Sequence, residues 1–418
     1  MNSKMKFVEN WGRLGMKFNI WKDCPKVPIT ELLSFIVDNR GKTVPTADDG
    51  WKLIATNCVT NNTLFPVYEK VRYLTQETYE TWFRAHPMPG DILFVNKGTP
   101  GRVCMVPDPV DFCIAQDMIA LRADDKKIYN KYLFAVLRSR EIQQQIYNTN
   151  VGDVIPHFKK QFMDQLLIPV PDRKIQEKIG NLYYQLSYKV ELNKKINENL
   201  LQQAQTLFYA WFVEYKPFGG IQPSDWKSIS VYDLAEYING AAFKKHEYAD
   251  TGLPIIKIAE LKNGITESTQ HCCVEKDPKY YIKDRDILFS WSGNPETSID
   301  TFVWSMGDAI LNQHTFRVVS KYEAPAFTFF LLKYLKPQFT HIASNKQTTG
   351  LGHVTVKDLK RLQFCTDRQA IKDFNDLTMP IFEMIYSNCK ESQGLSMLRD
   401  ALLPKLMSGE IDISSLGI

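Results

Sequence analysis

Short apolar runs broken by turn-forming residues occupy two stretches of the chain. From Gly50 to Leu121 the runs are WKLIAT, DILFV, RVCMV and MIALRA, separated by Gly, Pro, Asn and Asp, and the helical pattern YNKYLFAVLRSREIQQQIY follows them. Short β-rich runs bounded by breakers predict strands, and apolar residues three or four positions apart predict helices. The first stretch is therefore expected to form an α/β or α+β globular unit.

A second stretch repeats this order further along the chain. The runs PIIKIAEL, DILFSW, TFVWS and TFRVV are followed by the helical pattern FTFFLLKYL. Together the two stretches predict two globular units of the same class, arranged in tandem.

A long amphipathic segment, Lys174 to Phe212, follows the first unit and contains no Pro and a single Gly. Its apolar residues fall mostly three or four positions apart: Ile175, Ile179, Leu182, Leu186, Val190, Ile196, Leu200, Ala204, Leu207 and Trp211. This spacing is typical of a coiled-coil helix. A helix of roughly forty residues would be about 60 Å long, too long for one globular core, so we expect a partner helix beside it.

The segment Ala370 to Glu410, after the second unit, supplies that partner. Its apolar residues have similar spacing: Ile371, Phe374, Leu377, Ile381, Ile385, Leu395, Leu398, Leu402 and Leu406. Pro380 is expected to kink this helix or reset its start, and Pro404 to distort its last turns before Gly409 caps it. The two helices are predicted to pack along a facing seam, which leaves further apolar and aromatic surface without a partner, including Tyr183, Tyr184, Phe208 and Phe212.

Matching motifs indicate that the two units are copies of one another. GDILFVNKGTPG and RDILFSWSGNPE agree at six positions with a constant offset of 195 residues. FCIAQDMIAL around Gln116 matches AILNQHTFRV around Gln313, and the segment containing His157 matches the segment containing His353. Upstream, PITELLSFIV matches ISVYDLAEYI. The chain is therefore predicted to hold two copies of one unit of about two hundred residues.

Bulk composition is compatible with two to four folded domains. The 418 residues are 44% hydrophobic and 12% aromatic, which is ample for buried cores and excludes a disordered chain. A formal net charge of +4 and a pI near 8.4 permit a nucleic-acid partner without requiring one. Any such binding would depend on local basic patches.

The cysteines and the hydropathy favour a reducing compartment. Eight cysteines occur without a C-x-x-C pair, and the adjacent Cys272 and Cys273 suit neither a zinc site nor a disulfide framework, so reduced, buried thiols are expected. No segment resembles a signal peptide, and no run approaches the roughly eighteen apolar residues of a membrane span. We expect a cytoplasmic protein without a membrane partner.

The loop after the DILFV run is a candidate phosphate-binding site, but its residues do not fit that chemistry. A phosphate loop needs a Lys after its last Gly with Ser or Thr beside it, whereas Lys97 precedes Gly98. The second copy has Trp291 and Ser292 in the same loop and no Lys. A turn that closes a hairpin is the better interpretation.

The sequence contains no recognisable catalytic or metal-binding motif. The seven His show no H-E-x-x-H or other ligand spacing, and there is no G-x-S-x-G or H-x-E…P-C-x-x-C string. Asn294-Pro295-Glu296 begins like the Asn-Pro-Pro-aromatic signature of amino-methyltransferases, yet it lacks the second Pro and the aromatic residue. We therefore predict no catalytic residues, no metal site and no cofactor in this chain.

The order of the motifs points to a family more strongly than any one motif does. Each unit has D-I-L-F before a Gly-containing turn, then A-Q-D or N-Q-H, then H-F-K-K-Q or H-V-T-V-K, then a long helix, and the chain closes on LLPKLMSGEIDIS. In this order the chain resembles the specificity subunit of type I restriction-modification systems over nearly its whole length. The resemblance implies two tandem α/β (α+β) target recognition domains, separated by two long antiparallel coiled-coil helices in an internal pseudo-twofold repeat.

The resemblance also implies a division of the chain. Residues 1–173 would be the first target recognition domain, 174–215 the central spacer helix, 216–368 the second target recognition domain, and 369–418 the distal spacer helix and C-terminal tail. The folded parts of the two domains would run from Ile29 to about Pro171 and from Ile229 to about Thr366.

Members of this family recognise a bipartite site in double-stranded DNA, with one domain on each half and a gap set by the spacer helices. At about 3.4 Å per base pair, a helix of about 60 Å spans fewer than twenty base pairs, the right order for two half-sites. The implied partners are two adenine-N6 methyltransferase subunits and motor-nuclease subunits, which would bind S-adenosylmethionine, ATP and Mg. The surface of Tyr183, Tyr184, Phe208 and Phe212 would then be subunit interface.

Three features depart from the family pattern. About twenty residues precede the repeat, Pro380 interrupts the distal spacer, and Arg285 replaces the Gly expected before Asp286. Of these, only the Pro bears on the regularity of the spacer.

A recognition domain needs Lys or Arg for phosphates and polar loop side chains for base edges. The predicted DNA-binding residues are Asn96, Lys97, Thr99, Arg102, His157, Lys159 and Lys160 in the first domain, and Lys244, Lys245, Ser292, Asn294, His353 and Lys357 in the second. The alternative for each Lys or Arg is a solvated surface charge. The alternative for His157 and His353 is a capping or hydrogen-bonded histidine at the start of a helix.

Other residues common to the two copies are expected to be structural. Those that should fix the turn and the entry into the strand are Gly98, Gly293, Asp91 and Asp286. Gln116 and Gln313 are predicted to lie on apolar strands and to satisfy backbone groups rather than to read adenine. Because the loops of the two domains differ strongly, the domains should recognise different half-sites.

Two other functions stay open at this point. A structural scaffold or toxin-antitoxin-like protein-binding module would use the coiled coil for assembly without reading DNA, and weak, salt-independent DNA binding would favour it. A self-sufficient methyltransferase is the second alternative. The missing catalytic signature argues against it, whereas S-adenosylmethionine bound to the isolated chain would support it.

Overall fold

The computed structural model describes residues 18–39, 41, 43–114, 116–149, 156–347 and 350–412. The chain forms two compact units: unit 1 comprises Met1–Glu191 and Leu395–Ile418, and unit 2 comprises Leu192–Gly394. Most of the extra N-terminal residues, the VGDVI stretch and the end of the closing motif lie outside the described residues. The predicted division into recognition domains and spacers stays a prediction, because it concerns function rather than compactness.

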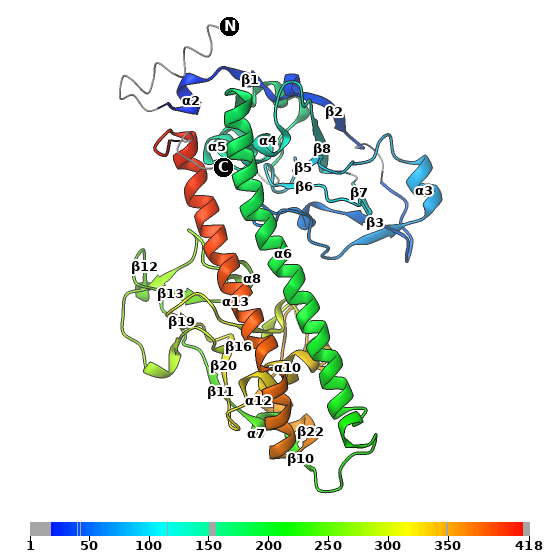
Figure 1. Ribbon diagram of the computed structural model, residues 1–418, viewed down its shortest axis with the longest axis vertical. Helices are drawn as coiled ribbons and strands as arrows, with labels where there is room; N and C mark the ends of the chain where they lie inside the picture. Colours follow the sequence, from blue (N-terminus) through cyan, green and yellow to red (C-terminus); the bar gives the residue numbers. More distant parts are fainter. Residues whose placement is uncertain are drawn as a thin grey trace. The chain divides into compact units, whose positions relative to one another are not determined.

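Unit 1 is built on a four-stranded antiparallel sheet in the order β2-β8-β5-β6 (Figure 1). Its strands are β2 (Leu33–Val37), β5 (Ile92–Val95), β6 (Val103–Met105) and β8 (Met118–Ala123). A second sheet has the order β4-β3-β7, in which β3 (Trp51–Ile54) is antiparallel to β4 (Arg72–Leu74) and parallel to β7 (Phe112–Ile114). The remaining elements are a strand pair, β1 (Lys26–Pro28) with β9 (Leu167–Pro169), the helices α2 (Ile20–Asp23), α3 (Gln76–Thr81), α4 (Asn130–Leu137) and α5 (Arg140–Asn148), and 3-10 turns at Ile29–Leu32, Thr56–Cys58 and Lys160–Gln165.

Unit 2 repeats this plan with the sheet order β11-β20-β16-β18. Its strands are β11 (Ala235–Asn239), β16 (Ile287–Ser290), β18 (Asp300–Val303) and β20 (Thr315–Ser320). A second sheet, β12-β14-β13-β19-β15, contains β12 (Tyr248–Ala249), β13 (Leu253–Ile256), β14 (His271–Cys272), β15 (Tyr281–Ile282) and β19 (Ala309–Leu311), and β13 is parallel to β19. Two strand pairs join β10 (Lys227–Ser230) to β22 (Gln363–Thr366) and β17 (Ser292–Gly293) to β21 (Gly352–His353). The helices are α7 (Val231–Leu234), α8 (Ile258–Asn263), α9 (Pro295–Ser298), α10 (Pro325–Tyr334), α11 (Lys336–Asn345) and α12 (Val356–Arg361), with 3-10 turns at Lys216–Phe218, Lys245–Glu247 and Pro278–Tyr280.

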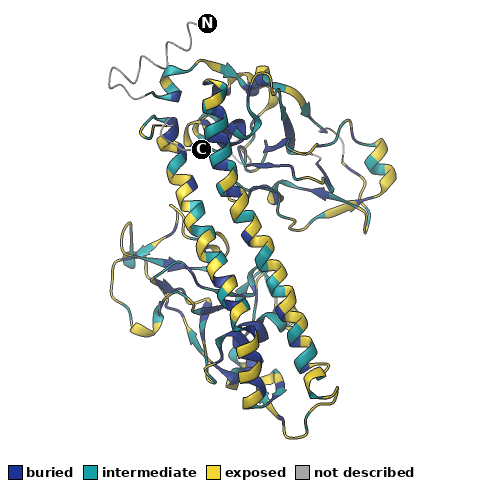
Figure 2. Cartoon of the chain, in the orientation of Figure 1, coloured by how far each residue is buried: buried dark blue, intermediate teal, exposed yellow. Residues whose placement is uncertain are grey.

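The common topology confirms the predicted repeat. β5 of unit 1 and β16 of unit 2 are the two DILF strands, and each lies between two antiparallel neighbours inside a four-stranded sheet. Every residue of β5 is fully buried, and those of β16 are at most 3% exposed. Burial on both faces accounts for the continuous apolar runs without alternation in these strands. Figure 2 shows the buried residues gathered on the central strands.

Two 40-residue helices, α6 (Arg173–Phe212) and α13 (Arg368–Met407), each contribute to both units. In unit 1, Arg399 of α13 donates to the hydroxyl of Ser187 of α6 at 3.5 Å. In unit 2, Asn193 of α6 donates to Glu391 at 2.6 Å, and further along α6 Asn197 donates to the carbonyl of Ile385 at 3.4 Å. Rising numbers on one helix meet falling numbers on the other, so the predicted antiparallel pairing is confirmed.

The predicted reset of the helix at Pro380 is wrong, because α13 runs through this residue as one helix, while the predicted kink stays a prediction. Proline removes one backbone donor and leaves the carbonyl four residues earlier, that of Asp376, without its usual partner, at a cost of about 3 kcal/mol. Both Asp376 and Pro380 are exposed, so water can bond that carbonyl. Phe374 and Phe382, before and after the proline, are buried in one core, and each such burial contributes about 1.5–3 kcal/mol. Packing therefore outweighs the local cost.

The last turns of α13 continue through the exposed Pro404 to Met407, so the predicted distortion does not end the helix early. Gly409 then adopts a left-handed φ of 74°, and its N–H donates to the carbonyl of Leu406 at 3.3 Å. Gly409 therefore caps the helix as predicted.

The predicted subunit interface is wrong for three of its four residues. Tyr183, Phe208 and Phe212 of α6 are 5%, 0% and 4% exposed and pack inside the chain's own cores. The Phe208 ring, for example, lies 5.4 Å from that of Phe374. Tyr184 is half-buried and stacks on Tyr188 at 5.9 Å, so a role in an interface stays a prediction for Tyr184 alone.

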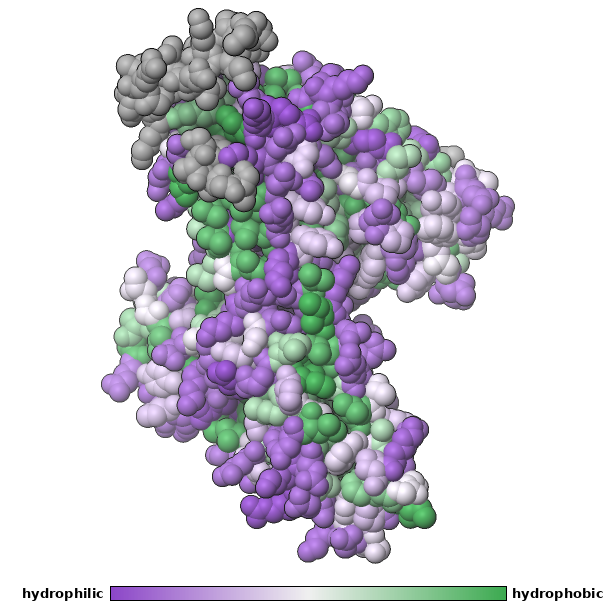
Figure 3. All heavy atoms as spheres, in the orientation of Figure 1, coloured by the Kyte–Doolittle hydropathy of each residue, from purple (hydrophilic) through white to green (hydrophobic). Residues whose placement is uncertain are grey.

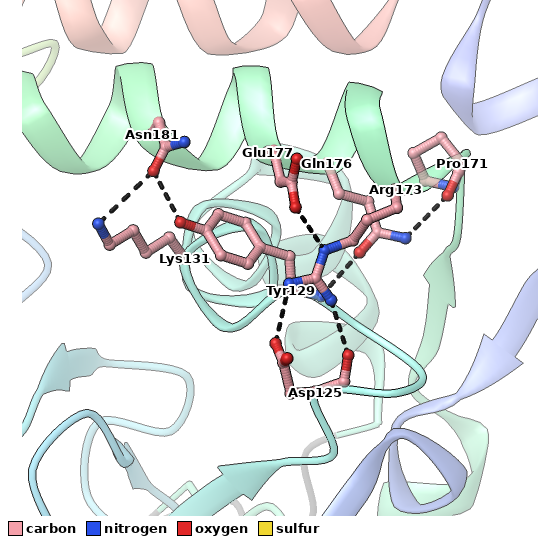
Figure 4. Close-up of polar contacts among 8 residues, drawn as sticks. All are labelled: Asp125, Tyr129, Lys131, Pro171, Arg173, Gln176, Glu177 and Asn181. Carbon is pink, nitrogen blue, oxygen red and sulfur yellow. Dashed lines mark hydrogen bonds and ion pairs between the residues drawn. The ribbon is translucent and has the colours of Figure 1, made fainter.

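The start of α6 is fixed to unit 1 by polar contacts (Figure 4). Gln176 accepts a hydrogen bond from the Tyr129 N–H at 2.8 Å, and the Tyr129 hydroxyl donates to Asn181 at 2.7 Å. Arg173 forms an ion pair with Asp125 at 2.9 Å. These bonds anchor the beginning of α6 to the residues around α4.

No helix within the described residues is both long and apolar enough to cross a membrane. All eight cysteines are free. Burial raises the pKa of Cys113 to about 12, as expected of an inert thiol, but Cys273 is exposed, so the prediction of buried thiols fails for that residue.

Candidate nucleic-acid interface

The loop after β5 closes a hairpin, as predicted, because β5 pairs antiparallel with β6 directly across it. Gly98 and Gly101 have φ values of 84° and 90°, a conformation that glycine adopts without strain. The N–H groups of Asn96 and Lys97 donate to the carbonyl of Asp117 at 2.9 and 3.3 Å. The turn between β7 and β8 therefore lies against this loop.

A third segment, about sixty residues further along the chain, joins the same loop. Lys97 forms an antiparallel bridge with His157. The Gly98 N–H donates to the Pro156 carbonyl at 2.9 Å, and the Phe158 N–H donates to the Asn96 carbonyl at 2.8 Å. The fold thus brings together the loop after β5, the turn before β8 and the His157 segment, which we call the loop edge of unit 1.

Unit 2 has the equivalent loop edge at the end of β16. Ser292 of β17 pairs with His353 of β21, as Lys97 pairs with His157. The Trp291 N–H donates to the carbonyl of His314, in the turn between β19 and β20, at 3.4 Å. The same three segments therefore converge in both units on one backbone frame, but they carry different side chains.

The predicted residues of unit 1 gather at its loop edge with one exception. Thr99, Arg102 and His157 are partly exposed, and Lys159 and Lys160 are exposed. Asn96 is only 1% exposed, and its side-chain oxygen has no partner among the described atoms. The prediction that Asn96 contacts DNA is therefore wrong for this arrangement, because its side chain points into the interior.

Carboxylates accompany two of the lysines at this edge. Lys97 is 3.7 Å from Asp117, and Lys160 is 3.3 Å from Asp38. Both lysine side chains are about half exposed, at 44% and 52%, and ion pairs of this kind contribute little. These ion pairs therefore hold the two lysine side chains only weakly.

Four predicted residues of unit 2 have partly or fully exposed side chains at the loop edge or beside it. Ser292 and His353 are partly exposed in the β17–β21 pair, and Lys357 is exposed on α12. Lys245 is exposed in the 3-10 turn that follows Ala241. Lys244 is also exposed and its backbone begins that turn, where its N–H donates to Glu247 at 2.7 Å.

Asn294 has a structural role that its sequence position did not indicate. Its side-chain oxygen accepts hydrogen bonds from the N–H groups of Glu296 and Thr297 at 3.2 and 3.1 Å and caps α9. This cap satisfies helix donors that would otherwise lack partners. Asn294 therefore fixes the loop. Its side-chain oxygen is occupied by these hydrogen bonds, so it is not available as the acceptor in the predicted contact with a base.

The capping part of the alternative for the two histidines is wrong, whereas its other part, a hydrogen-bonded histidine, stays open. Thr355 caps α12 through Asp358, and Lys159 precedes the 3-10 turn in unit 1. His157 and His353 instead form the backbone bridges that hold the loop edge together.

The structural roles predicted for the glycines and aspartates are confirmed. Asp91 and Asp286 accept the N–H groups of Met88 and Lys283, each at 2.8 Å, where the chain enters the central strand. Burial raises the pKa of Asp286, although the Lys283 N–H and the charge of Arg317 oppose this shift. Gly98, in the turn after β5, and Gly293, at the end of β17, have positive φ values of 84° and 126°.

The predicted strand position of the two glutamines is wrong in both units. Gln116 lies in the turn between β7 and β8, and Gln313 lies in the turn between β19 and β20, and both are exposed. Neither turn contains a Gly or Pro, so the turn signal in the sequence was limited to one residue in each, Asp117 and Asn312. Both turns belong to the loop edges.

No group of three or more His, Cys, Asp or Glu side chains that could hold a metal ion occurs in the part of the chain that the structure describes. Exposed basic, hydroxyl and amide side chains dominate both edges, and such groups bind phosphates and base edges.

Comparison with known proteins places this architecture in a family. The family model described as the type I restriction modification DNA specificity domain matches residues 28–202 and again residues 223–365. The chain is 25% identical to the type I restriction enzyme MjaIX specificity subunit of Methanocaldococcus jannaschii, over 69% of this chain and 71% of that protein. It is 22% identical to the HindI specificity subunit of Haemophilus influenzae, over 77% of this chain and 86% of that protein.

A solved structure has the same fold. The crystal structure of the type I restriction-modification system S subunit from M. genitalium superposes with a TM-score of 0.51 at 16% identity, and it covers 91% of this chain and 95% of its own. The repeated family match spans more than half of the chain, once in each copy. The chain belongs to the type I restriction-modification DNA specificity family, and it is a specificity subunit rather than a catalytic one.

Proposed function

We propose that this specificity subunit reads a bipartite site in double-stranded DNA, with the loop edge of each unit on one half-site. The repeated edge carries the proposal: three segments meet on the same frame in both units, with Lys97 and Asp117 in one and Ser292 and His314 in the other. Base readout depends on side chains, whereas the frame fixes where they lie. The same backbone arrangement with different side chains in the two units would allow them to recognise two different half-sites.

Exposed lysines would provide the phosphate contacts of each half-site. The candidates are the half-exposed Lys97 and the exposed Lys159 and Lys160 in unit 1, and the exposed Lys244, Lys245 and Lys357 in unit 2. Shorter-range contacts would come from Thr99, Arg102, His157, Ser292 and His353. Phosphate contacts position the protein and make its affinity depend on salt.

The helices α6 and α13 would act as spacers and as the docking surface for two adenine-N6 methyltransferase subunits and for motor-nuclease subunits. Figure 3 shows apolar side chains among hydrophilic ones on the visible face. The exposed apolar residues of these helices are Tyr188, Leu192, Tyr209, Leu377, Met384, Met397 and Leu398. In this proposal the partners bind S-adenosylmethionine, ATP and Mg, and the complex works in the cytoplasm.

Co-expression with a type I methyltransferase subunit, followed by mapping of N6-methyladenine across the host genome, tests the proposal. We expect one split motif, methylated on both strands, and no motif in cells that lack the methyltransferase. A stable complex that methylates no motif would overturn the proposal and favour the scaffold function.

A further inference from the structure

The turn between β19 and β20 is polar and exposed although buried residues flank it. Gln313 and His314 are exposed, whereas Leu311 before them and Thr315 after them are 1% and 0% exposed. At this position neither side chain packs in a core or lies on a helix, so neither stabilises the fold in these ways. The turn therefore offers an amide and an imidazole to solvent from the loop edge of unit 2.

The backbone of this turn is held on three sides. The Gln313 N–H donates to the Ala241 carbonyl at 2.9 Å, and the Gly240 N–H donates to the Thr315 carbonyl at 3.1 Å. The His314 carbonyl accepts from Trp291. Gly240 permits this approach, because a Cβ there would lie 2.3 Å from the carbonyl oxygen of Asn312. Because the backbone of the turn is already fixed, binding costs little backbone freedom, which favours recognition by its side chains.

The side chains of Gln313 and His314 belong to a series of contacts that includes two aromatic residues. The Trp291 ring stacks on Phe316 at 5.6 Å, and its Nε1–H donates to Asn239 at 3.2 Å. The His314 ring lies 5.8 Å from that of Trp291, and the Gln313 Nε2 lies 3.5 Å from the His314 Nε2. A chain of contacts thus runs from the buried Phe316 through Trp291 and His314 to Gln313.

We infer that Gln313 is a specificity-determining residue that reads an adenine in the half-site of unit 2, and that Trp291 positions it through His314. The inference rests on the proposed function. A carboxamide offers one acceptor and one donor, which match the N6 amino group and N7 of adenine in the major groove. Asn294, the other carboxamide of this loop segment, is less suited because its side-chain oxygen caps α9.

Unit 1 carries Gln116 in the equivalent turn, followed by Asp117 in place of His314. The inference therefore extends to an adenine in each half-site, read by the same residue type, with the neighbouring position of the turn differing between the halves. The Asp117 carboxylate is close to Lys97, whereas the His314 imidazole lies beside the Trp291 ring. The residue that follows the glutamine therefore has different neighbours in the two units.

The test uses the complex of the full chain with its methyltransferase and a set of duplexes in which each base pair of the wild-type motif is replaced in turn. The quantity measured is the ratio of methylation rates on the intact and the substituted duplex. We expect Gln313→Ala to lower this ratio about tenfold to a hundredfold at one A·T pair of one half-site. Gln338→Ala, which removes an exposed glutamine of α11 in the same unit, should leave every ratio unchanged.

The role of Trp291 has its own readout. Trp291→Ala should relax the same A·T pair as Gln313→Ala, and Trp291→Phe should restore most of the discrimination, because a ring is kept between Phe316 and His314. Relaxation at several pairs, or no rescue by Phe, would mean that Trp291 only stabilises the loop.

Failure of the inference differs from failure of the proposed function. If Gln313→Ala keeps every ratio, or lowers all rates without changing any ratio, Gln313 reads no base and the inference is overturned while the wild-type motif stands. If the wild-type complex itself prefers no duplex, the proposed function fails first.

Discussion

Arg285 donates its Nε to Glu383 on α13 at 3.0 Å while its own backbone adopts a left-handed φ of 74°. Its guanidinium also lies 4.3 Å from the centroid of the Tyr386 ring. The equivalent residue of unit 1, Gly90, has a φ of 85°. Entry into the central strand therefore requires a left-handed residue in both units, and contacts with α13 offset the strain in unit 2.

Two substitutions of Arg285 separate the backbone strain from the side-chain contacts. Arg285→Ala keeps the strained φ and loses the contacts with Glu383 and Tyr386, whereas Arg285→Gly loses the same contacts but relieves the strain. We expect the Ala variant to melt below the wild type and the Gly variant to melt about 2–4 °C above the Ala variant in thermal unfolding. Equal melting temperatures for the two variants would contradict a left-handed requirement.

Gly180 allows α4 to approach α6 closely in unit 1. A Cβ at this position would lie 2.5 Å from the backbone nitrogen of Tyr132 and 2.9 Å from the carbonyl carbon of Lys131. These are backbone atoms, so the clash cannot be relieved by a side-chain rotation. We expect Gly180→Ala to destabilise unit 1 by about 1–3 kcal/mol in urea unfolding, although Ala alone would favour the helix by about 1 kcal/mol.

Gly394 of α13 is the matched control for Gly180, since no atom lies within 4 Å of a Cβ added there. Gly394→Ala should stabilise the protein by about 1 kcal/mol through helix propensity alone. The interpretation of Gly180 fails if both variants change stability in the same direction.

Asp300 should make unit 2 sensitive to acid. Burial raises the pKa of this carboxyl, but ion pairs with Lys333 at 2.8 Å and Lys336 at 2.6 Å outweigh burial and lower the pKa below its usual value near 3.8. The ion pairs therefore contribute stability above the unfolded-state pKa, and this contribution is lost as the pH falls through the lowered folded-state pKa.

Replacing Asp300 tests this dependence. We expect Asp300→Asn to lower the free energy of unfolding by about 2 kcal/mol at pH 7, with the difference from the wild type shrinking below about pH 4. Asp277→Asn removes an exposed carboxyl that pairs with Lys279 and should leave the stability unchanged. A difference for Asp300→Asn that is constant from pH 7 to pH 3 would show that packing, rather than charge, is responsible.

The repeat and the long helices could be predicted because their signals are local and strong. The DILF runs are buried on both faces, and an apolar spacing of three to four residues that persists over forty positions is specific to a long amphipathic helix. The spacing did not show which residues each apolar face of the helices packs against. Tyr183 and Phe208 were assigned to a subunit interface, yet they pack inside the cores of their own units.

The loop edges could be predicted only in part, because their contacts join segments far apart in the sequence. Lys97 and His157 were both candidates, but nothing in the sequence showed that they pair. Asn96 and Trp291 are equivalent in the repeat, yet the first is buried and the second is partly exposed. Side-chain direction at a strand end depends on local twist and packing, which composition does not carry.

Lys159 offers a direct test of DNA contact, because it is exposed at the loop edge and precedes the 3-10 turn Lys160–Gln165. A lysine that contacts phosphate releases counterions on binding, so its loss weakens binding to all DNA sequences alike. The negative slope of log K against log salt then becomes smaller in magnitude by about 0.9. We expect this for Lys159→Ala, with the motif unchanged, in titrations of the complex at several salt concentrations. Lys126→Ala, which removes an exposed lysine of unit 1 outside the loop edge, should leave the slope unchanged.

If both variants reduce the magnitude of the slope equally, electrostatic attraction is spread over the whole surface and the loop edge is not the contact site. If neither does, Lys159 is the solvated charge that its exposure alone would predict.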